Sequence, residues 1–307
     1  IKKDDEVIIP ALTFVADINV VKMVGAKAVL ADSSSLDDWN VSVSSIEKCI
    51  TSKTKAVIVV HYAGYSCDMP GIVKLCKERK IKLIEDVAHA PGASILAKKC
   101  GTWGDIGCFS FFSNKNLSIG EGGMVMTKDL HLYKRLQYLR SHGMTSLTLD
   151  RHKGRAITYD VSEPGLNYRM DEMRSSIGIV QLGKLEEGNK RRKEHTDLYR
   201  SELKGSPFFM PYKERLESEV ASYHIMPIML PEELNREDVI GHLKSKKIQS
   251  SIHYPPFWNF TGFKDEFKKE NTPITSIISE RQLTLPLFPT MTSENVKSVA
   301  FHLLELV

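Results

Sequence analysis

Lys115 occupies an unusual position in the sequence, within the stretch SFFSNKNLSIGEGG that runs from residue 110 to 123. An aromatic, strand-like segment precedes this lysine and a cluster of glycines follows it. A single loop lysine is ordinarily a solvated surface charge. A lysine that is held neutral can instead attack a carbonyl carbon and form a Schiff base. The sequence around Lys115 therefore leaves two interpretations open, a surface charge and a reactive amine.

Asp86 ends the apolar segment IKLIED, and His89 follows shortly after it. A carboxylate at the end of a buried strand is costly unless it meets a cation or hydrogen-bond donors. Asp86 can be the N-cap of a helix or one half of a structural ion pair, or it can pair with a protonated ring nitrogen of a ligand. His89 can flank the same ligand or can form a hydrogen bond inside the core.

Ser110 lies between Phe109 and Phe111, in a segment whose alternation turns the two rings to one face and the serine to the other. The serine is either an ordinary strand residue or a donor to a phosphate group. The GEGG cluster at 120–123 allows the backbone to turn sharply and re-enter a sheet. Because GEGG lacks the spacing of a P-loop or a Rossmann fingerprint, it predicts no phosphate site of its own.

An acid, a serine and a lysine at one sheet edge are the side chains that pyridoxal 5′-phosphate (PLP) requires. The lysine forms a Schiff base with the PLP aldehyde, and the acid keeps the pyridine nitrogen protonated so that the ring accepts electrons. Because only a neutral amine attacks the aldehyde, burial or nearby cations should lower the pKa of this lysine. Lys115, Asp86 and Ser110 are the candidates for these three positions.

Short apolar segments alternate with helical patterns over the first half of the chain. Strands are expected at 6–10, 26–32, 55–62, 81–86, 105–112 and 122–127, and helices at 19–26, 42–50 and 69–80. This alternation predicts an α/β fold with a mostly parallel central sheet and helices on both faces. Ligands of such sheets bind beyond the carboxyl ends of the strands, which places Tyr62, Asp86 and His89 near a site.

A long helical pattern runs from Asp171 to Leu203 and stops at KGSP. The pattern then changes, with strands expected at 222–230 and 248–254 and helices at 235–247 and 293–307. We expect a large cofactor-binding domain over residues 1–204 and a smaller C-terminal α+β domain over residues 205–307.

The composition excludes several classes of protein. The 307 residues carry 42 basic and 38 acidic side chains, and a net charge of +4 gives no electrostatic footprint for nucleic acid. No apolar run reaches membrane-spanning length, so no membrane partner is expected. The five cysteines are widely spaced without a C-x-x-C pair, which indicates neither a disulfide framework nor a zinc site and favours a reducing cytoplasm. The chain begins at Ile1 without a methionine, and we expect further residues upstream.

Five stretches resemble the DegT-type sugar-nucleotide aminotransferases, a PLP-dependent family of fold type I. They follow the family order over most of the chain and read IIPALTFVADINVVKMVGAKAVLAD, AVIVVHYAGYSCDM, LIEDVAHAPGA, GDIGCFSFFSNKNLSIGEGG and GLNYRMDEMRSSIGIVQL. The resemblance implies that Lys115 is the Schiff-base lysine and that Asp86 pairs with the pyridinium nitrogen. It also implies that His89 lies against the cofactor, that Ser110 holds its phosphate and that Phe14 stacks on its ring.

The resemblance further implies a homodimer with shared active sites, because the GLNYRM stretch of the family reaches into the neighbouring subunit. Asn167 and Arg169 would contact the cofactor phosphate there. His253 and Tyr254 match a region that lines the sugar-nucleotide pocket of the family, and we assign Tyr62 to the substrate side of the site with them. The family's Gly-Ser/Thr-Ala phosphate loop lies upstream of the segment that matches IKKDDEVIIP, and it is absent from this sequence.

The resemblance predicts a PLP-dependent aminotransferase that moves an amino group, with glutamate as the expected donor, to a keto-sugar nucleotide. Lys115 would carry the proton between the donor's α-carbon and the cofactor. Two alternatives stay open: a PLP-dependent sugar dehydratase of the same fold, and a non-catalytic regulatory or sensor protein. Dehydratases of the family that eliminate a C3 hydroxyl carry histidine at the lysine position, so Lys115 favours transamination. Only the absent phosphate loop favours the sensor.

Overall fold

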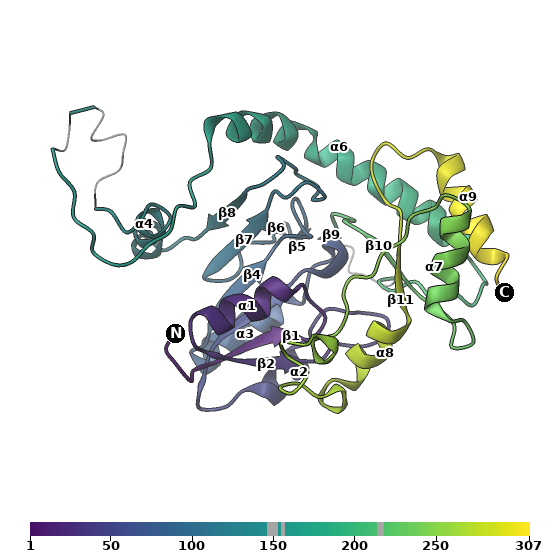
Figure 1. Ribbon diagram of the computed structural model, residues 1–307, viewed down its shortest axis with the longest axis horizontal. Coiled ribbons are helices and arrows are strands. Elements are labelled where there is room, and N and C mark those ends of the chain that lie inside the picture. The colour runs from purple at the N-terminus through teal and green to yellow at the C-terminus, as the bar shows by residue number, and fades with distance from the viewer. Residues whose placement is uncertain (146–152, 155–156, 214–217) are drawn as a thin grey trace.

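The computed structural model describes residues 1–145, 153–154, 157–213 and 218–307, and a six-stranded sheet forms its centre (Figure 1). The strands, in spatial order, are β2 (Lys27–Ala31), β1 (Glu6–Pro10), β3 (Thr54–Val60), β4 (Lys82–Asp86), β7 (Ile106–Ser110) and β8 (Gly123–Met126). The first five run parallel to one another, and β8 is antiparallel to β7. The mostly parallel sheet predicted from the alternating pattern is therefore present.

Helices cover both faces of this sheet, because side chains along each strand alternate between the two faces. Val7 and Ile9 of β1 pack with α1 (Val15–Met23) on one face. Ile8 packs on the other face, in the cluster that holds buried residues of α2 (Val43–Cys49) and α3 (Met69–Arg79). Because both faces of the sheet are buried, successive residues of these strands are apolar.

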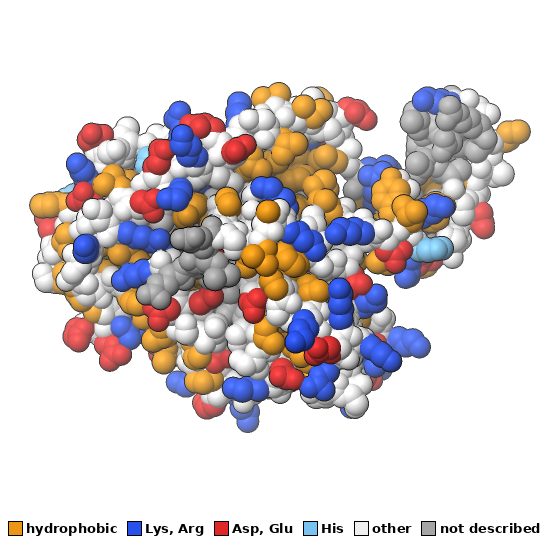
Figure 2. All heavy atoms as spheres, turned by 180° about the vertical axis from the view of Figure 1, so that it is seen from behind, with side chains coloured by type: hydrophobic (Ala, Val, Ile, Leu, Met, Phe, Trp, Pro, Cys, Tyr) orange, Lys and Arg blue, Asp and Glu red, His pale blue; other side chains and the backbone are white. Residues whose placement is uncertain are grey.

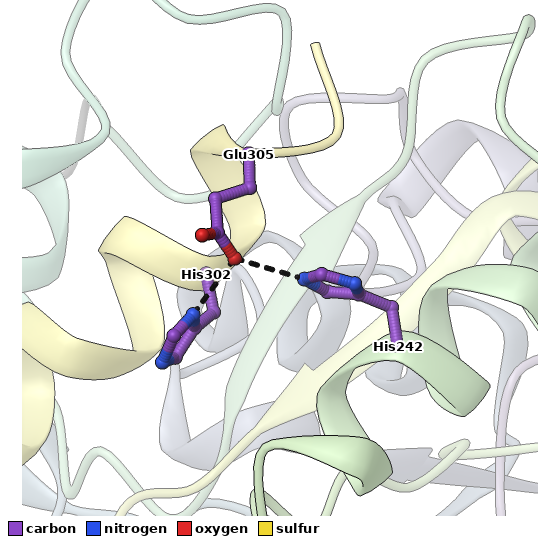
Figure 3. A group of neighbouring side chains, drawn as sticks. All are labelled: His242, His302 and Glu305. Atoms are coloured by element: carbon purple, nitrogen blue, oxygen red, sulfur yellow. Dashed lines mark hydrogen bonds and ion pairs between the residues drawn. The ribbon is translucent and has the colours of Figure 1, made fainter.

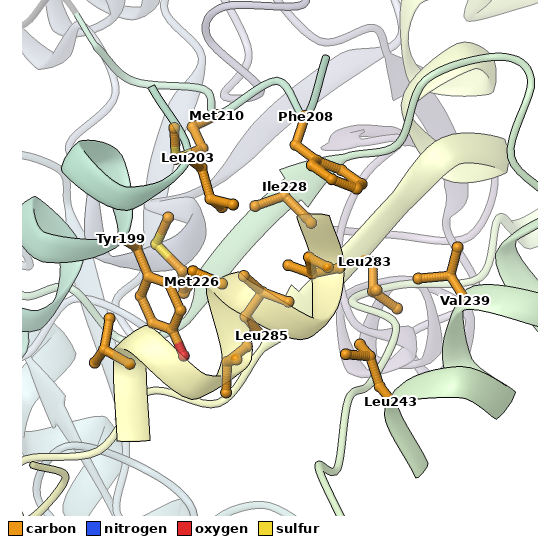
Figure 4. Packing of buried hydrophobic residues seen from close by; sticks show 14 of the residues in the cluster. Tyr199, Leu203, Phe208, Met210, Met226, Ile228, Val239, Leu243, Leu283 and Leu285 are labelled. Carbon is orange, nitrogen blue, oxygen red and sulfur yellow. The ribbon is translucent and has the colours of Figure 1, made fainter. Parts of the chain in front are cut away.

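The C-terminal part of the chain builds a second hydrophobic core (Figure 4). It forms around β10 (Met226–Met229), which pairs antiparallel with β11 (Gln282–Leu285). Helices α7 (Arg236–Ser245) and α9 (Ser293–Leu304) supply further buried residues. The end of α6 (Glu172–Glu202) also contributes to this core, through Tyr199.

Some contacts cross between the two halves of the chain. Phe257 and Phe267 pack with α1 against the large sheet rather than in the C-terminal core. Conversely, Tyr199 and Leu203 belong to the C-terminal core although they precede residue 205. The division at residue 204 stays a prediction.

The remaining described elements are short. They are α4 (Leu130–Leu139), α8 (Pro273–Arg281), the strands β5 (Ser94–Ile95), β6 (Lys98–Lys99) and β9 (Glu219–Val220), and the 3-10 helices η1 (Tyr62–Gly64), η2 (Phe257–Asn259) and η3 (Lys269–Asn271). The strand expected at 248–254 is wrong, since that segment forms only an isolated bridge from Ser251 to Thr284. Pro255 and Pro256 follow it and lack the N–H groups that a ladder needs. The strand that pairs with β10 is β11, which the sequence did not reveal.

The first half of α6 carries apolar side chains that face away from the protein. Met173, Ile177 and Val180 follow the spacing of one helical face and are 78%, 49% and 58% exposed. All four residues of the neighbouring sheet-edge strand β8 are also exposed. In the described part of the chain, no helix is both long enough and apolar enough to cross a bilayer.

Candidate active site

Lys115 lies in the loop that connects β7 to β8, beyond the carboxyl end of β7. The loop folds back on itself, because the N–H of Ile119 donates to the carbonyl of Phe111 and the N–H of Phe111 donates to the carbonyl of Gly122, both at 2.9 Å. A β-carbon on Gly123 would lie 2.7 Å from the carbonyl oxygen of Phe109, so the chain can re-enter the sheet only with glycine at this position.

The side chain of Asn116 forms hydrogen bonds with three residues outside this loop. Its Nδ2 donates to Asn189 Oδ1 on α6 and to the carbonyl of Ser222, both at 2.8 Å. Its Oδ1 accepts from Nδ1 of His224, also at 2.8 Å. The neighbour of the candidate lysine therefore connects the large sheet, α6 and the segment before β10. Neither Asn116 nor His224 was predicted as a site residue, because no local sequence pattern identifies an asparagine that forms hydrogen bonds with distant residues.

The amine of Lys115 and the carboxylate of Asp86 interact, and both are half-buried. Burial lowers the pKa of Lys115, and the negative charge of Asp86 opposes that shift. Burial raises the pKa of Asp86, whereas the Ala88 N–H at 2.7 Å from Oδ1 and the charge of Lys115 lower it. The residues after Asp86 form turns rather than a helix, so the interpretation of Asp86 as a helix N-cap is wrong.

Asp17 of α1 is a buried acid near Asp86 that the sequence analysis missed. Its carboxyl accepts a hydrogen bond from the Thr13 hydroxyl at 2.5 Å. Burial raises the pKa of Asp17 well above its usual value, and the charge of Asp86 raises it further. Two close carboxylates do not ionise together easily, so Asp17 and Asp86 carry one negative charge more readily than two.

His89 is a neutral imidazole with a defined tautomer. Burial, then the charges of His224 and Lys115, lower its pKa well below the usual value. The Ala63 N–H donates to His89 Nδ1 at 3.3 Å, so the proton lies on Nε2 and is donated to the hydroxyl of Tyr254 at 2.7 Å. The Tyr254 hydroxyl therefore accepts from His89 and keeps its own proton available for a further acceptor.

Two further imidazoles stay neutral around the amine. Burial followed by the charge of Lys115 lowers the pKa of His224 well below its usual value, and lowers that of His253 to about 4. The His89 ring lies 4.3 Å from that of His224 and 6.4 Å from that of His253, measured between centroids. Neutral rings add donors and acceptors to the site without repelling a protonated lysine.

The remaining predicted residues divide into those near this group and those away from it. The hydroxyl of Tyr62 donates to the carbonyl of His253. The Phe14 ring is 55% exposed and lies 5.5 Å from the Tyr254 ring. Ser110 ends β7, and its hydroxyl accepts from the Phe112 N–H at 3.3 Å.

Asn167 and Arg169 are exposed and lie in the segment between α4 and α6. Asn167 forms an isolated bridge with Ser141. None of the described contacts of Lys115 or Asp86 involves these two residues. Within one chain, therefore, the predicted phosphate contacts of Asn167 and Arg169 are not formed, and their assignment stays a prediction.

The donor set suits PLP. A half-buried amine with a lowered pKa is ready to react with an aldehyde. Asp86 Oδ1 accepts from Ala88, and among the described residues no hydrogen bond to Asp86 Oδ2 is found, which leaves that oxygen for a ring N–H. The exposed face of Phe14 can cover an aromatic ring, and the Ser110 hydroxyl can donate to phosphate.

Comparisons with known proteins agree with this chemistry. The sequence model of the DegT/DnrJ/EryC1/StrS aminotransferase family matches residues 1–304. GDP-perosamine synthase of Escherichia coli O157:H7 is 36% identical over 296 residues, which cover 96% of this chain and 77% of that protein.

Two solved structures have the same fold. Helicobacter pylori PseC, an aminotransferase involved in the biosynthesis of pseudoaminic acid, gives a TM-score of 0.90 at 27% identity and covers 99% of this chain and 80% of its own. A Streptococcus pneumoniae protein described as a sugar aminotransferase gives 0.87 in its PLP form, at 28% identity, and covers 98% of this chain and 82% of its own. The predicted fold class is confirmed.

Proposed function

Because the chain belongs to the DegT/DnrJ/EryC1/StrS aminotransferase family, we propose that it is a PLP-dependent enzyme that transfers an amino group to a keto-sugar nucleotide. The single observation that carries this proposal is the shared site of the Lys115 amine and the Asp86 carboxylate at the carboxyl edge of the sheet. The similarity to GDP-perosamine synthase supports a sugar-nucleotide substrate. Glutamate is the amino donor that we propose, on the resemblance to the family alone.

Bound PLP supplies a protonated ring that accepts an electron pair from the substrate carbon. We assign Lys115 Nζ to the covalent attachment of the cofactor and Asp86 to the ring nitrogen. The Ser110 hydroxyl donates to the cofactor phosphate, Phe14 covers the ring, and His89 lies beside it. Each assignment uses a group whose burial or hydrogen bonds leave the required atom free.

Lys115 also moves the proton during transfer. Its lowered pKa favours the neutral amine, and only a neutral amine can take a proton from the donor's α-carbon. The same nitrogen would then give the proton to C4′ of the cofactor. His253, Tyr254 and Tyr62 lie on the substrate side, where the hydroxyl proton that Tyr254 retains is suited to an oxygen of the sugar.

We propose that two copies of the chain form a dimer. The support is the exposed apolar surface of β8 and the first half of α6. Figure 2 shows hydrophobic side chains gathered along the upper part of the rear face, where α6 runs. A contiguous apolar surface of this kind favours a protein partner. Asn167 and Arg169, exposed in the single chain, would then reach the cofactor phosphate of the partner.

The two alternatives have less support. A sugar dehydratase of this fold is disfavoured by the presence of Lys115 where the C3 dehydratases carry histidine. A sensor would not need a half-buried lysine with a lowered pKa beside an acid. Five unpaired cysteines support the cytoplasm as the location that we propose.

The proposed function predicts a visible absorption band and an amino transfer that both depend on Lys115. The purified protein should turn yellow with PLP, and Lys115→Ala should lose the band and at least about 10³-fold of the transfer rate to a keto-sugar nucleotide. Lys264→Ala, at an exposed lysine, is the matched control and should keep both. Borohydride reduction followed by peptide mass spectrometry would identify the modified lysine. A cofactor fixed at another lysine would remove Lys115 from this role.

A further inference from the structure

The ends of α7 and α9 bring three potential metal ligands together (Figure 3). His242 comes from the last turn of α7, and His302 comes from the last turn of α9. Glu305 follows α9 and points its carboxylate between the two rings. One ligand atom of each residue lies within 4.8 Å of the others.

One atom of this group has no partner. Nε2 of His242 is buried, and no hydrogen bond to it is found in the described part of the chain. It lies 3.3 Å from Glu305 Oε2, without the geometry of a hydrogen bond. A buried polar atom without a partner costs about 1–3 kcal/mol, and such atoms in a native protein usually face an ion or water. Since it forms no hydrogen bond, Nε2 of His242 can be a metal ligand.

The spacing of the atoms agrees with tetrahedral zinc. Bonds of about 2.0–2.1 Å place neighbouring ligands of a tetrahedron roughly 3.3 Å apart. The distance from His242 Nε2 to Glu305 Oε2 is 3.3 Å, and that from His302 Nδ1 to the same oxygen is 2.8 Å. Since all three ligand atoms lie within 4.8 Å of one another, rotation of the side chains can bring them to coordination distance from one ion. Two imidazoles and one carboxylate are a ligand set that Zn²⁺ uses with a water molecule as the fourth ligand.

The charges around these three residues favour the binding of a cation, although the Lys246 ammonium group competes for Glu305. The carbonyl ends of α7 and α9 carry partial negative charge. Glu305 adds a carboxylate, which is ordinarily ionised at neutral pH, 2.8 Å from His302 Nδ1. Lys246 Nζ lies 3.6 Å from Glu305 Oε2 and competes for the same carboxylate. Because Lys246 is long and partly exposed, it can turn to solvent when an ion arrives.

We propose that His242, His302 and Glu305 bind Zn²⁺, or another divalent transition metal ion with the same preference, and that the ion fastens α7 to α9. Val239 and Leu243 flank His242 on α7 and are buried in the C-terminal core, as is Leu303 beside His302. The ion would therefore brace two helices that already share a hydrophobic contact. The site is separate from Lys115 and predicts a structural role rather than a part in amino transfer.

The test is zinc binding by the chelator-treated, purified protein, measured by competition with a chromophoric zinc indicator. We expect one Zn²⁺ per chain at micromolar or lower concentration and a rise in the thermal unfolding midpoint. His242→Gln and His302→Gln should each weaken binding by more than about 100-fold, since even residues that only orient a metal ligand change affinity by about 10–100-fold. Lys246→Met should bind zinc at least as tightly as the parent, because the competing charge is gone.

Cobalt gives a second readout that does not depend on stability. Co²⁺ in a tetrahedral nitrogen and oxygen site absorbs in the visible, at longer wavelength than bound PLP, and His302→Gln should lose these bands. The PLP band and the amino transfer should be unchanged in all these variants. A negative result for zinc binding would therefore leave the proposed function standing. No zinc binding at micromolar concentration, or equal affinity in the parent and in the His242→Gln/His302→Gln double variant, would overturn the proposal.

Discussion

The ionisation of Lys115 is set by two influences that act in opposite directions. Burial disfavours the ammonium form, and the carboxylate of Asp86 favours it. The three imidazoles around the amine stay neutral and so do not add charge of their own. The net effect is an amine that loses its proton more readily than an ordinary lysine.

This balance makes a prediction for Lys115 in the cofactor-free protein. Acetylation of Lys115 by acetic anhydride, quantified by peptide mass spectrometry over a range of pH, should reach half of its maximal rate below the ordinary lysine pKa of about 10.4. In Asp86→Asn the attraction that holds the proton is lost, so the half-maximal pH should move lower still, by about one unit.

Lys264, which is exposed, serves as an internal control in the same digest and should behave as an ordinary lysine. If the pH dependence of Lys115 acetylation is the same in Asp86→Asn as in the parent, the two side chains do not interact. That result would contradict a common site for Lys115 and Asp86.

Some candidate site residues stand in a sequence pattern that predicts their position, and others do not. Asp86 is the last residue of β4 and Lys115 lies in the loop after β7, and the rule for parallel sheets places both at one edge. Asp17 and Asn116 carry no such signal. Asp17 matters because α1 folds it beside Asp86, and Asn116 because residues on α6 and before β10 come within hydrogen-bond distance. Such contacts exist only after the chain has folded.

At the scale of elements, β2 and α8 are joined by one carboxylate. Asp32, directly after β2, accepts hydrogen bonds from the N–H groups of Ile274 and Thr275 at 3.0 and 2.8 Å. It also accepts from the Thr275 hydroxyl at 2.7 Å. These are the unpaired donors at the start of α8, so Asp32 caps a helix that is distant in sequence.

Asp32→Ala should lower the free energy of unfolding by about 1–2 kcal/mol, the usual effect of losing a helix cap. The midpoint of urea unfolding, followed by circular dichroism, is the measurement. Asp37→Ala removes an exposed acid from the same loop and should leave the midpoint unchanged. An Asp32→Ala protein as stable as the Asp37→Ala control would show that the cap contributes nothing.

The same contact explains why α8 was missed while the central strands were found. Apolar runs in the sequence predict the strands at 6–10, 55–62 and 81–86. β1 and β4 lie within the first and last of these ranges, and β3 starts one residue earlier than expected, at Thr54. The start of α8 depends on an acid that arrives from another part of the chain. A pattern read along the sequence cannot contain that information. The strand β11 was missed for a similar reason, since its pairing with β10 is long-range.

At the scale of the whole molecule, the exposed apolar face of α6 predicts association. Val180→Lys places a charge where we expect a dimer contact and should shift the protein toward the monomer in light scattering coupled to size exclusion. It should also reduce PLP affinity, because Asn167 and Arg169 of a partner could no longer reach the phosphate. Val24→Lys changes a valine of similar exposure, 54% against 58%, and should have neither effect. A monomeric parent protein with full PLP affinity would contradict the proposal that two subunits share each active site.

The side chains that enclose Lys115 come from places far apart in the sequence. Asp86 precedes it, whereas His224, His253 and Tyr254 follow by more than a third of the chain. In the unfolded chain this lysine is hydrated and protonated like any other lysine. The segments that carry His224 and His253 must fold against the loop before its surroundings are complete. The reactivity that PLP requires therefore belongs to the folded chain and not to the loop sequence alone.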